Sequence, residues 1–444
     1  MWPTAPPPPP RPRASQPRPP PPRRSRASPP RALRFDAQRP WRPDFDPAAR
    51  VQQGDGGSAL PPRPQFAGQL VSKSKTLKSL YSHTATTTLP FPSPPLSSDP
   101  DRGSNLGFRP LAVLLAGTRS SGMKLAGLKS VEGAHEESVW AAAWAPAADH
   151  RPTALLLTGA LDETVRVWRP DDLAAVGTPA RGHALGVVSL AAHPAGAFAA
   201  AVSLDSYIRV FDVDSGASVA TLEAPPSEVW GVQFHPKGSA LAAAGGGSGS
   251  VKVWDTEKWQ PVTSLAVPRP EGARPDKTGS GKFVLSVAWS PDGKLLACGS
   301  MDGTIAVYDA VRMKFLHHLE GHHMPVRSMV FSPVDPHVLF TACDDCHIHI
   351  YDAKEKSLIG AMSGHASWVL SIDVSPDGMA VATGSSDRTV RLWDINTRAS
   401  VQTMSNHSDQ VWAVAFRPPG GTGVRAGRLA SASDDKSISL YDYS

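Results

Sequence analysis

Residues 364–394 read GHASWVLSIDVSPDGMAVATGSSDRTVRLWD, and this stretch decides the fold. It opens with Gly-His and closes with Trp-Asp. Between them, three runs of alternating or apolar residues predict β-strands, and Pro, Gly, Ser and Asp between the runs predict tight turns. The expected strands cover 367–374, 379–385 and 389–394. Short strands joined by tight turns predict one antiparallel sheet.

The same ending recurs through the chain after residue 160. A strand closes on an aromatic residue at Trp168, Phe211, Trp254, Tyr308, Tyr351, Trp393 and Tyr441. Asp follows all of these aromatics except the first, which Arg169 follows. Successive aromatics lie 43, 43, 54, 43, 42 and 48 residues apart. A period of this length predicts an all-β protein, a seven-bladed β-propeller with one four-stranded blade per repeat.

The sixth repeat resembles the WD-repeat family in its Gly-His, its Ser-Pro-Asp-Gly turn and its Asp before Trp-Asp. The resemblance implies a hydrogen-bonded set of His365, Thr383 or Ser385, Asp387 and Trp393. A buried imidazole and a buried carboxylate must satisfy each other, so the set is physically sound. A structural role is predicted also for the histidines at the same place in other repeats, His135, His183, His322 and His407. The third repeat departs, with Ser248 in place of Asp and Ala224-Pro225 in place of Gly-His, and the fourth lacks the His.

Two regions follow from this pattern. We expect residues 123–444 to form the WD-repeat propeller, with 124–131 closing the ring by pairing beside 437–443. Residues 1–122 hold 26 of the 45 prolines, 18 Lys and Arg, six Asp and no Glu. This composition predicts a disordered N-terminal leader. Three interpretations stay open: upstream sequence outside a working protein that begins at Met123, a basic interaction tail, or an organelle transit peptide.

Several function classes are disfavoured. The leader carries a net charge of +12, which leaves −7 on 123–444, so direct nucleic-acid binding is not expected. No apolar run is long enough to span a membrane. The three cysteines are too few for a secreted disulfide framework. We find no nucleophile elbow or Walker loop, and Gly245–Gly249 lies between strands rather than before a helix. We therefore expect no enzyme, no cofactor and no small-molecule substrate.

One local motif resembles a metal or redox site. Cys343-Asp344-Asp345-Cys346 precedes His347 and His349, and Cys-x-x-Cys can bind zinc. However, there is no second Cys-x-x-Cys, and the repeat register places Asp345 at the turn Asp. We predict a structural role for this motif and no metal.

Partner binding is expected on the face that carries the blade-start loops and the Asp turns. By register, large side chains fall there at Trp368, Phe283, Trp140, Trp230, Trp412, Arg327, Leu161, Leu204 and Met301. Trp and Arg are common interface hot spots. Trp368 and Arg327 are predicted to be exposed, whereas Trp140, Trp230 and Trp412 either face partners or pack between blades. Insertions at 267–282 and 417–428 are expected on opposite faces.

Residues 123–444 also resemble one subfamily closely, through segments such as LEAPPSEVWGVQF (222–234), LEGHHMPVRSMVFSPVDP (319–336) and NHSDQVWAVAFRPPGGTGVRAGRLAS (406–431). The chain is similar to the WD-repeat subunit shared by the superkiller (Ski) complex and the polymerase-associated factor (Paf) complex, of the plant vernalization-independence type. The resemblance implies a non-enzymatic scaffold for messenger-RNA decay in the cytoplasm. In the nucleus it implies a role in transcription elongation, histone modification and flowering time. Its expected partners are protein subunits of both complexes.

Two other kinds of propeller are weighed against this reading. A WD-repeat substrate receptor of a cullin-RING ubiquitin ligase is the alternative, but it would typically show Trp-Asp-x-Arg. Here Thr256-Glu257 and Ile395-Asn396 follow the two Trp-Asp pairs. A G-protein β-type subunit would need an N-terminal coiled coil, where this chain has proline.

Overall fold

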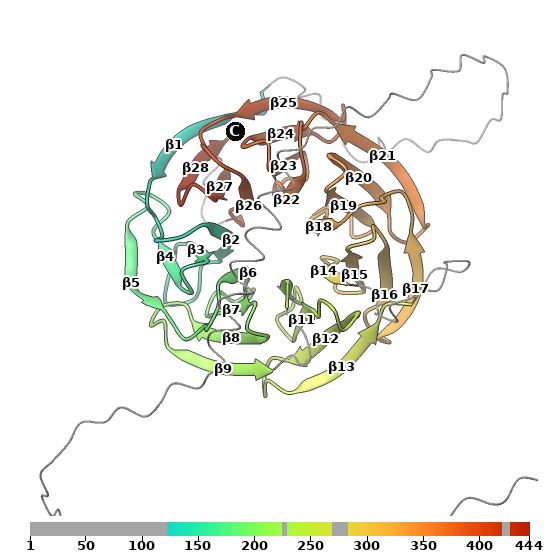
Figure 1. The fold of residues 1–444 in the computed structure, drawn as a ribbon, viewed down its shortest axis with the longest axis horizontal. Coiled ribbons are helices and arrows are strands. Elements are labelled where there is room, and N and C mark those ends of the chain that lie inside the picture. Colours follow the sequence, from blue (N-terminus) through green and yellow to red (C-terminus); the bar gives the residue numbers. More distant parts are fainter. Residues whose placement is uncertain (1–121, 224–228, 269–282, 420–426) are drawn as a thin grey trace, which may run out of the picture. The chain divides into compact units, whose positions relative to one another are not determined.

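The computed structural model describes residues 122–223, 229–268, 283–419 and 427–444. Within them, 28 strands form seven four-stranded antiparallel sheets arranged around a central opening (Figure 1). The prediction of a seven-bladed all-β propeller is confirmed. The leader up to residue 121 and most of both insertions (269–282 and 420–426) lie outside the described residues.

Each blade runs from an inner strand at the opening to an outer strand at the rim (Figure 1). Blade 1 contains β2 (Val139–Ala145), β3 (Leu155–Ala160), β4 (Val165–Trp168) and β5 (Ala175–Ala180). Blade 2 contains β6 (Val187–Ala192), β7 (Phe198–Ser203), β8 (Tyr207–Asp212) and β9 (Ser218–Glu223). Blade 3 contains β10 (Gly231–Phe234), β11 (Ala240–Ala244), β12 (Ser250–Asp255) and β13 (Pro261–Ala266). Blade 4 contains β14 (Val284–Trp289), β15 (Leu295–Ser300), β16 (Ile305–Asp309) and β17 (Lys314–Leu319).

The remaining blades follow the same order. Blade 5 contains β18 (Val326–Phe331), β19 (Val338–Cys343), β20 (His347–Asp352) and β21 (Ser357–Ser363). Blade 6 contains β22 (Val369–Val374), β23 (Ala380–Ser385), β24 (Val390–Asp394) and β25 (Ala399–Met404). Blade 7 contains β26 (Val411–Phe416), β27 (Gly427–Ser433), β28 (Ile438–Tyr443) and β1 (Leu125–Val131). The strands predicted for the sixth repeat therefore agree with the structure to within two residues.

Local sequence explains the blade-6 turn. Ser375 Oγ donates to Asp377 Oδ1 at 2.5 Å, and that carboxylate oxygen accepts the N–H of Met379 at 3.0 Å. Gly378 follows at φ 70°, a left-handed conformation that favours glycine. The turn therefore reverses the chain between β22 and β23 with its polar groups satisfied.

The two ends of the described chain close the ring. β1 pairs antiparallel with β28, with Leu125 opposite Tyr443 and Val131 opposite Ile438. Lys124 N–H donates to Ser444 O at 2.9 Å, and Ser444 N–H donates back to Lys124 O at 3.1 Å. The predicted pairing of the first and last strands is confirmed.

The core lies between neighbouring blades. Trp393 of blade 6 is 1% exposed and belongs to one buried cluster with Val338, Phe340 and Ile350 of blade 5. Burial of a large apolar side chain stabilises the fold by about 1.5–3 kcal/mol. The repeated aromatics thus hold adjacent blades together. The described residues contain no helix, and so none that could cross a membrane.

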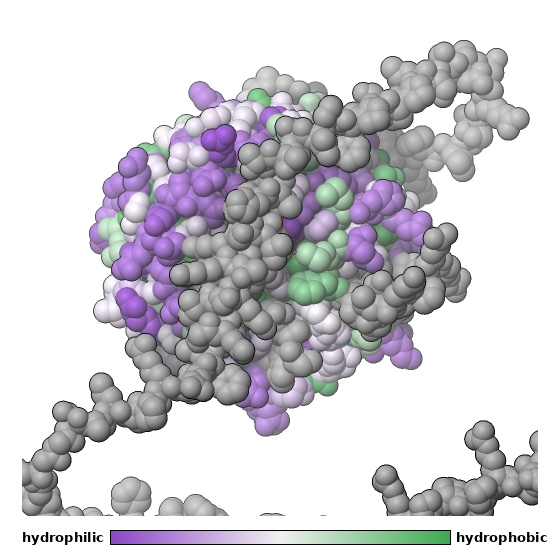
Figure 2. Space-filling model, in the orientation of Figure 1, coloured by the Kyte–Doolittle hydropathy of each residue, from purple (hydrophilic) through white to green (hydrophobic). Residues whose placement is uncertain are grey.

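Antiparallel order places two kinds of connection at the same end of every blade. One is the loop before each inner strand, and the other is the turn between the second and third strands. We call this end the upper face; it includes residues 132–138, 161–164, 364–368 and 386–389. Figure 2 shows one face of the ring, with hydrophobic side chains gathered over β14 and β18.

Candidate partner-binding site

Hydrogen-bonded sets build the upper face. In blade 6, His365 Nδ1 lies 2.8 Å from Asp387 Oδ2, and its Nε2 lies 2.7 Å from Thr383 Oγ1. Trp393 Nε1 donates to the same Thr383 oxygen at 2.8 Å. Thr383, rather than Ser385, is therefore the strand member of the set, because Ser385 Oγ donates instead to Trp368 O.

The sets recur with changes. Blades 1, 5 and 7 repeat the His–Asp contact through His135–Asp162, His322–Asp345 and His407–Asp435. Burial alone would raise the pKa of these aspartates, but the His hydrogen bond brings it below the ordinary value. Each pair fixes a blade-start loop to a turn, which makes the upper face rigid.

Blade 2 varies the set. Arg209 donates to His183 Nδ1 at 2.8 Å and pairs with Asp205 at 2.9 Å, so the guanidinium stands between imidazole and carboxylate. Burial, and then the Arg209 charge, lowers the pKa of His183 to about 4. All five histidines with a predicted structural role are buried.

Two aromatic pairs lie near the opening on the upper face. The rings of Trp140 and Trp412 stack with centroids 4.2 Å apart, joining blade 1 to blade 7. Trp140 Nε1 donates to Asp434 Oδ1 at 2.8 Å. Trp230 and Phe283 meet edge to face at 6.2 Å, joining blade 3 to blade 4. All four rings are half-buried, so they pack between blades and still present part of their surface.

Arg327 differs from its prediction. Its guanidinium binds Asp344 in a two-bond pair at 2.8 and 2.7 Å, and the two side chains are 8% and 3% exposed. The expectation of an exposed Arg327 is wrong, because this carboxylate holds it against the blade. Arg327 also lies over the half-buried ring of Trp368, 5.8 Å from its centroid.

The three aliphatic residues predicted at this face, Met301, Leu161 and Leu204, differ in exposure. Met301 is 40% exposed, whereas Leu161 and Leu204 are half-buried. Met301 N–H donates to Phe283 O at 2.8 Å, which places these two residues together on blade 4. Their presence at this face agrees with the register, but their contact with partners stays a prediction.

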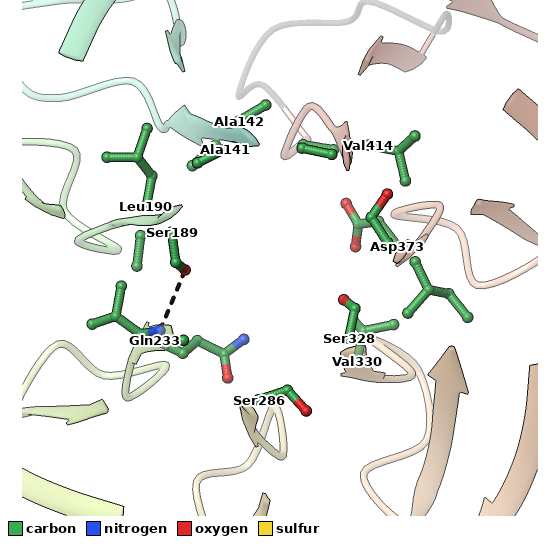
Figure 3. Close-up of a pocket in the computed structure, with 18 of the residues that line it drawn as sticks. Ala141, Ala142, Ser189, Leu190, Gln233, Ser286, Ser328, Val330, Asp373 and Val414 are labelled. Carbon is green, nitrogen blue, oxygen red and sulfur yellow. Dashed lines mark hydrogen bonds between the residues drawn. The ribbon is translucent and has the colours of Figure 1, made fainter. Parts of the chain in front are cut away.

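A central cavity of about 430 Å³ opens between the inner strands. Trp140, Trp230, Trp412 and Arg327 line it, whereas Phe283, Trp368 and the three aliphatic residues are not in its wall. Ser189, Gln233, Ser286, Ser328 and Asp373 form a more polar part of the cavity wall, with Gln233 and Asp373 on opposite sides (Figure 3).

Sequence reasoning missed the two largest polar groups of this wall. Gln233 Oε1 accepts the N–H of Trp289 in the next blade at 2.6 Å, and Asp373 Oδ2 accepts the N–H of Phe416 at 2.6 Å. Burial raises the pKa of Asp373 to about 7. A signal existed, because the other blades carry Ala or Val at this place: Ala143, Ala191, Ala288, Val330 and Ala415.

The residues of the cysteine motif make separate contacts. Cys343 Sγ donates to Met324 O at 3.2 Å, as a structural residue would. His347 is exposed, and His349 Nδ1 contacts Tyr351 Oη at 3.0 Å. The structure instead brings His322, from the blade-start loop, beside Cys343 and Asp345. Sequence reasoning missed this grouping because His322 lies far from the motif in the chain.

Family models match most of the propeller. The model described as "WD domain, G-beta repeat" matches residues 128–169, 356–394 and 398–442. The model of the Nucleolar protein 10-like N-terminal domain matches residues 187–366. The WD repeats inferred from the sequence are thus confirmed.

The chain is also similar in sequence to several WD-repeat-containing and related proteins. The WD repeat-containing protein VIP3 of Arabidopsis thaliana is 70% identical over 323 residues, which cover 72% of this chain and 100% of that protein. The chain belongs to the VIP3 family of WD-repeat proteins. The WD repeat-containing protein SL1-17 of Schistosoma mansoni is 31% identical over 69% of this chain and 96% of its own. The Denticleless protein homolog of Danio rerio is 26% identical over 53% and 41%. This VIP3-family chain is a WD-repeat scaffold for protein–protein interaction.

Proposed function

We propose that this VIP3-family chain is the WD-repeat subunit shared by the Paf transcription-elongation complex and the Ski messenger-RNA decay complex. The carrying observation is its 70% identity to VIP3 of Arabidopsis over the whole length of that protein. The scaffold acts by holding partner segments, without catalysis, in both the nucleus and the cytoplasm.

The geometry supports a rigid platform. The His–Asp sets and the paired ends of the chain fix the loops of the upper face. Partly exposed aromatic rings on a rigid frame offer large contact area with little loss of conformational freedom. We expect partner segments to contact Met301, Phe283 and the edge of Trp368 around the cavity mouth.

Affinity purification tests this proposal. The tagged full chain is expressed in cells of its own source, and the co-purifying chains are identified by mass spectrometry in nuclear and cytoplasmic fractions. Polymerase-associated subunits are expected from the nucleus and the helicase assembly from the cytoplasm. Met301→Ala and Trp368→Ala should lower recovery at unchanged thermal stability.

A matched control uses the opposite end of the blades. Val311 lies between β16 and β17 and is 74% exposed, so Val311→Ala should change neither recovery nor stability. Recovery of neither set of subunits would overturn the proposal. Recovery of a cullin adaptor instead would support the substrate-receptor alternative.

A further inference from the structure

The face opposite the upper face, which we call the lower face, carries the turn between the first and second strands of each blade. In two blades this turn begins with histidine, His193 after β6 and His235 after β10. The other five blades carry Pro, Ser or Arg at that place: Pro146, Ser290, Ser332, Ser375 and Arg417. Both rings are half-buried, and each contacts the next blade in the ring. A histidine therefore stands at each of the two seams, or blade-to-blade contacts, of blade 3.

His193 joins blade 2 to blade 3 and uses both ring nitrogens. Its Nε2 lies 3.1 Å from Gly238 O of blade 3, and its ring meets Phe234 of that blade edge to face at 5.2 Å. Its Nδ1 accepts the N–H of Ala195, in its own turn, at 3.1 Å. Nδ1 therefore holds a lone pair, and the ring proton is on Nε2, which donates it to the carbonyl.

His235 repeats this arrangement between blades 3 and 4. Its Nδ1 accepts the N–H of Lys237, in its own turn, at 3.1 Å, and its Nε2 donates to the Gly293 backbone of blade 4. The ring meets Trp289 of blade 4 edge to face at 5.0 Å. Each imidazole thus caps its own turn with one nitrogen and binds the next blade with the other. Only the neutral ring can do both.

A second proton on either ring would point at a backbone N–H. The turn would lose its cap, and the ring would have to rotate, which takes Nε2 away from its carbonyl. Burial, and to a smaller extent the charge of Lys237, lowers the pKa of His235 against the opposing effect of its bond to Gly293. Its contribution to stability is therefore present above the unfolded pKa of about 6.5 and is lost as pH falls below it.

The charged groups around the two rings do not favour the protonated form. The turns packed near them carry Arg151, Asp214, Lys237, Glu257, Lys258, Asp292 and Lys294. Asp214 is already paired with His150 at 2.7 Å and lies 3.5 Å from Arg151. Asp292 pairs with Lys294 at 3.1 Å, and Glu257 is exposed.

The seams that join blades 6, 7, 1 and 2 use groups that mild acid does not weaken. Arg151 of blade 1 donates to Gly196 O of blade 2 at 2.8 Å, and Arg428 of blade 7 donates to Pro170 O of blade 1. A guanidinium keeps its charge at every pH that a protein meets. Asp373 joins blade 6 to blade 7, and its raised pKa means that its contribution grows in acid.

We propose that His193 and His235 make blade 3 a pH-sensitive part of the ring, because mild acid opens the lower ends of its two seams while the seams of blades 6, 7, 1 and 2 stay closed. Blade 3 depends on these rings because it lacks the His–Asp set of the upper face, with Ser248 and Ala224-Pro225 in its place. The seam to blade 2 opens first. A further hydrogen bond across it, from Val232 N–H to Ser189 Oγ, is long at 3.4 Å.

The test uses the full chain and hydrogen–deuterium exchange, read by mass spectrometry at pH 7.5 and pH 5.5 and corrected for the intrinsic pH dependence of amide exchange. Protection of the amides in β10 and β11 should fall by about tenfold at pH 5.5, because one pH unit below the unfolded histidine pKa is worth about a factor of ten. Protection in β22 and β23 of blade 6 should change by less than about twofold.

The double variant His193→Gln and His235→Gln supplies the decisive comparison. Glutamine offers a donor and an acceptor but does not titrate, so the protection of blade 3 should be the same at both pH values, whatever its level. His150→Gln is the matched control, since His150 lies on the same face in blade 1 with its side chain 61% exposed, and it should respond to acid as wild type does.

An equal loss of protection in blades 3 and 6 of wild type at pH 5.5 would overturn the proposal. An unchanged acid response of blade 3 in the double variant would also overturn it. If the double variant fails to fold, the two single variants and the comparison of blades in wild type decide.

Discussion

Blades 6 and 3 are both four-stranded antiparallel sheets, but different side chains stabilise their turns and their contacts with the next blade. Blade 6 ties its upper face with His365, Thr383 and Asp387, and its Asp373 reaches the next blade. In blade 3 the turn is held by Ser248, whose hydroxyl donates to Gly245 O at 2.6 Å, and Gln233 reaches the next blade. The backbone pairing is the same in both sheets. A blade can therefore form the same sheet without the aspartates that blade 6 carries at these two places.

The largest effect is expected from breaking the blade-6 set. Asp387→Ala leaves the fully buried His365 side chain without its carboxylate and removes the acceptor of the Ala366 N–H. Removing one member of a buried pair costs about 3–5 kcal/mol. The free energy of unfolding, measured with urea at pH 7, should fall by that amount. A loss below about 1 kcal/mol would show that blade 6 depends on packing as blade 3 does.

Low pH should reduce the stability that Asp387 contributes to blade 6. The pKa of Asp387 is lowered in the folded protein, mainly by His365, against the opposing effect of burial. Its contribution is therefore fully present above the unfolded pKa of about 3.9 and is lost as pH falls below it. The stability gap between wild type and Asp387→Ala should narrow from pH 4 downward. A constant gap would contradict the role of the carboxylate charge.

The repeats determine how much of the fold and of the candidate site the sequence predicts. The period and the turn residues predicted seven blades, the ring closure and the His365 set, because each depends on local pattern. The register predicts the correct face for Arg327 but the wrong exposure, because Asp344 lies in the turn between β19 and β20 and its pairing with Arg327 arises only on folding. His322 reached Cys343 in the same way, across 21 residues of chain. The repeat register predicts where these side chains lie, but their partners depend on packing between segments that are distant in the sequence.

The inter-blade contact of Asp373 should have a stability effect of intermediate size, with a pH dependence opposite to that of Asp387. The folded pKa of Asp373 is raised to about 7, so its contribution is present below the unfolded pKa and is lost as pH rises through 7. Asp373→Asn keeps an acceptor for the Phe416 N–H but removes the charge. At pH 8 it should stabilise the protein by roughly 1–3 kcal/mol, since each pKa unit is worth about 1.4 kcal/mol and the Asp373 residue is half-buried rather than fully buried.

Gln233→Glu is the converse control. It places a carboxyl at the equivalent position of blade 3, so it should destabilise the protein above neutral pH and much less at pH 5. Thermal melting of both variants across pH 5–8 checks the pair. Parallel pH curves for wild type and both variants would rule out a raised pKa for the carboxyl at either position.

The smallest effect is expected at Ser248. Its hydroxyl bonds Gly245 O and lies 3.0 Å from Ser250 Oγ, and no buried charge depends on it among the described residues. Ser248→Ala removes a neutral hydrogen bond worth about 1 kcal/mol, so urea unfolding should shift by that amount or less. Ser248→Asp restores the residue of the other repeats without their imidazole, because Ala224-Pro225 stands in its place. It should therefore gain nothing. A stabilisation comparable to the loss in Asp387→Ala would mean that the carboxylate alone, capping the turn N–H groups, supplies most of what the His–Asp pair contributes in blade 6.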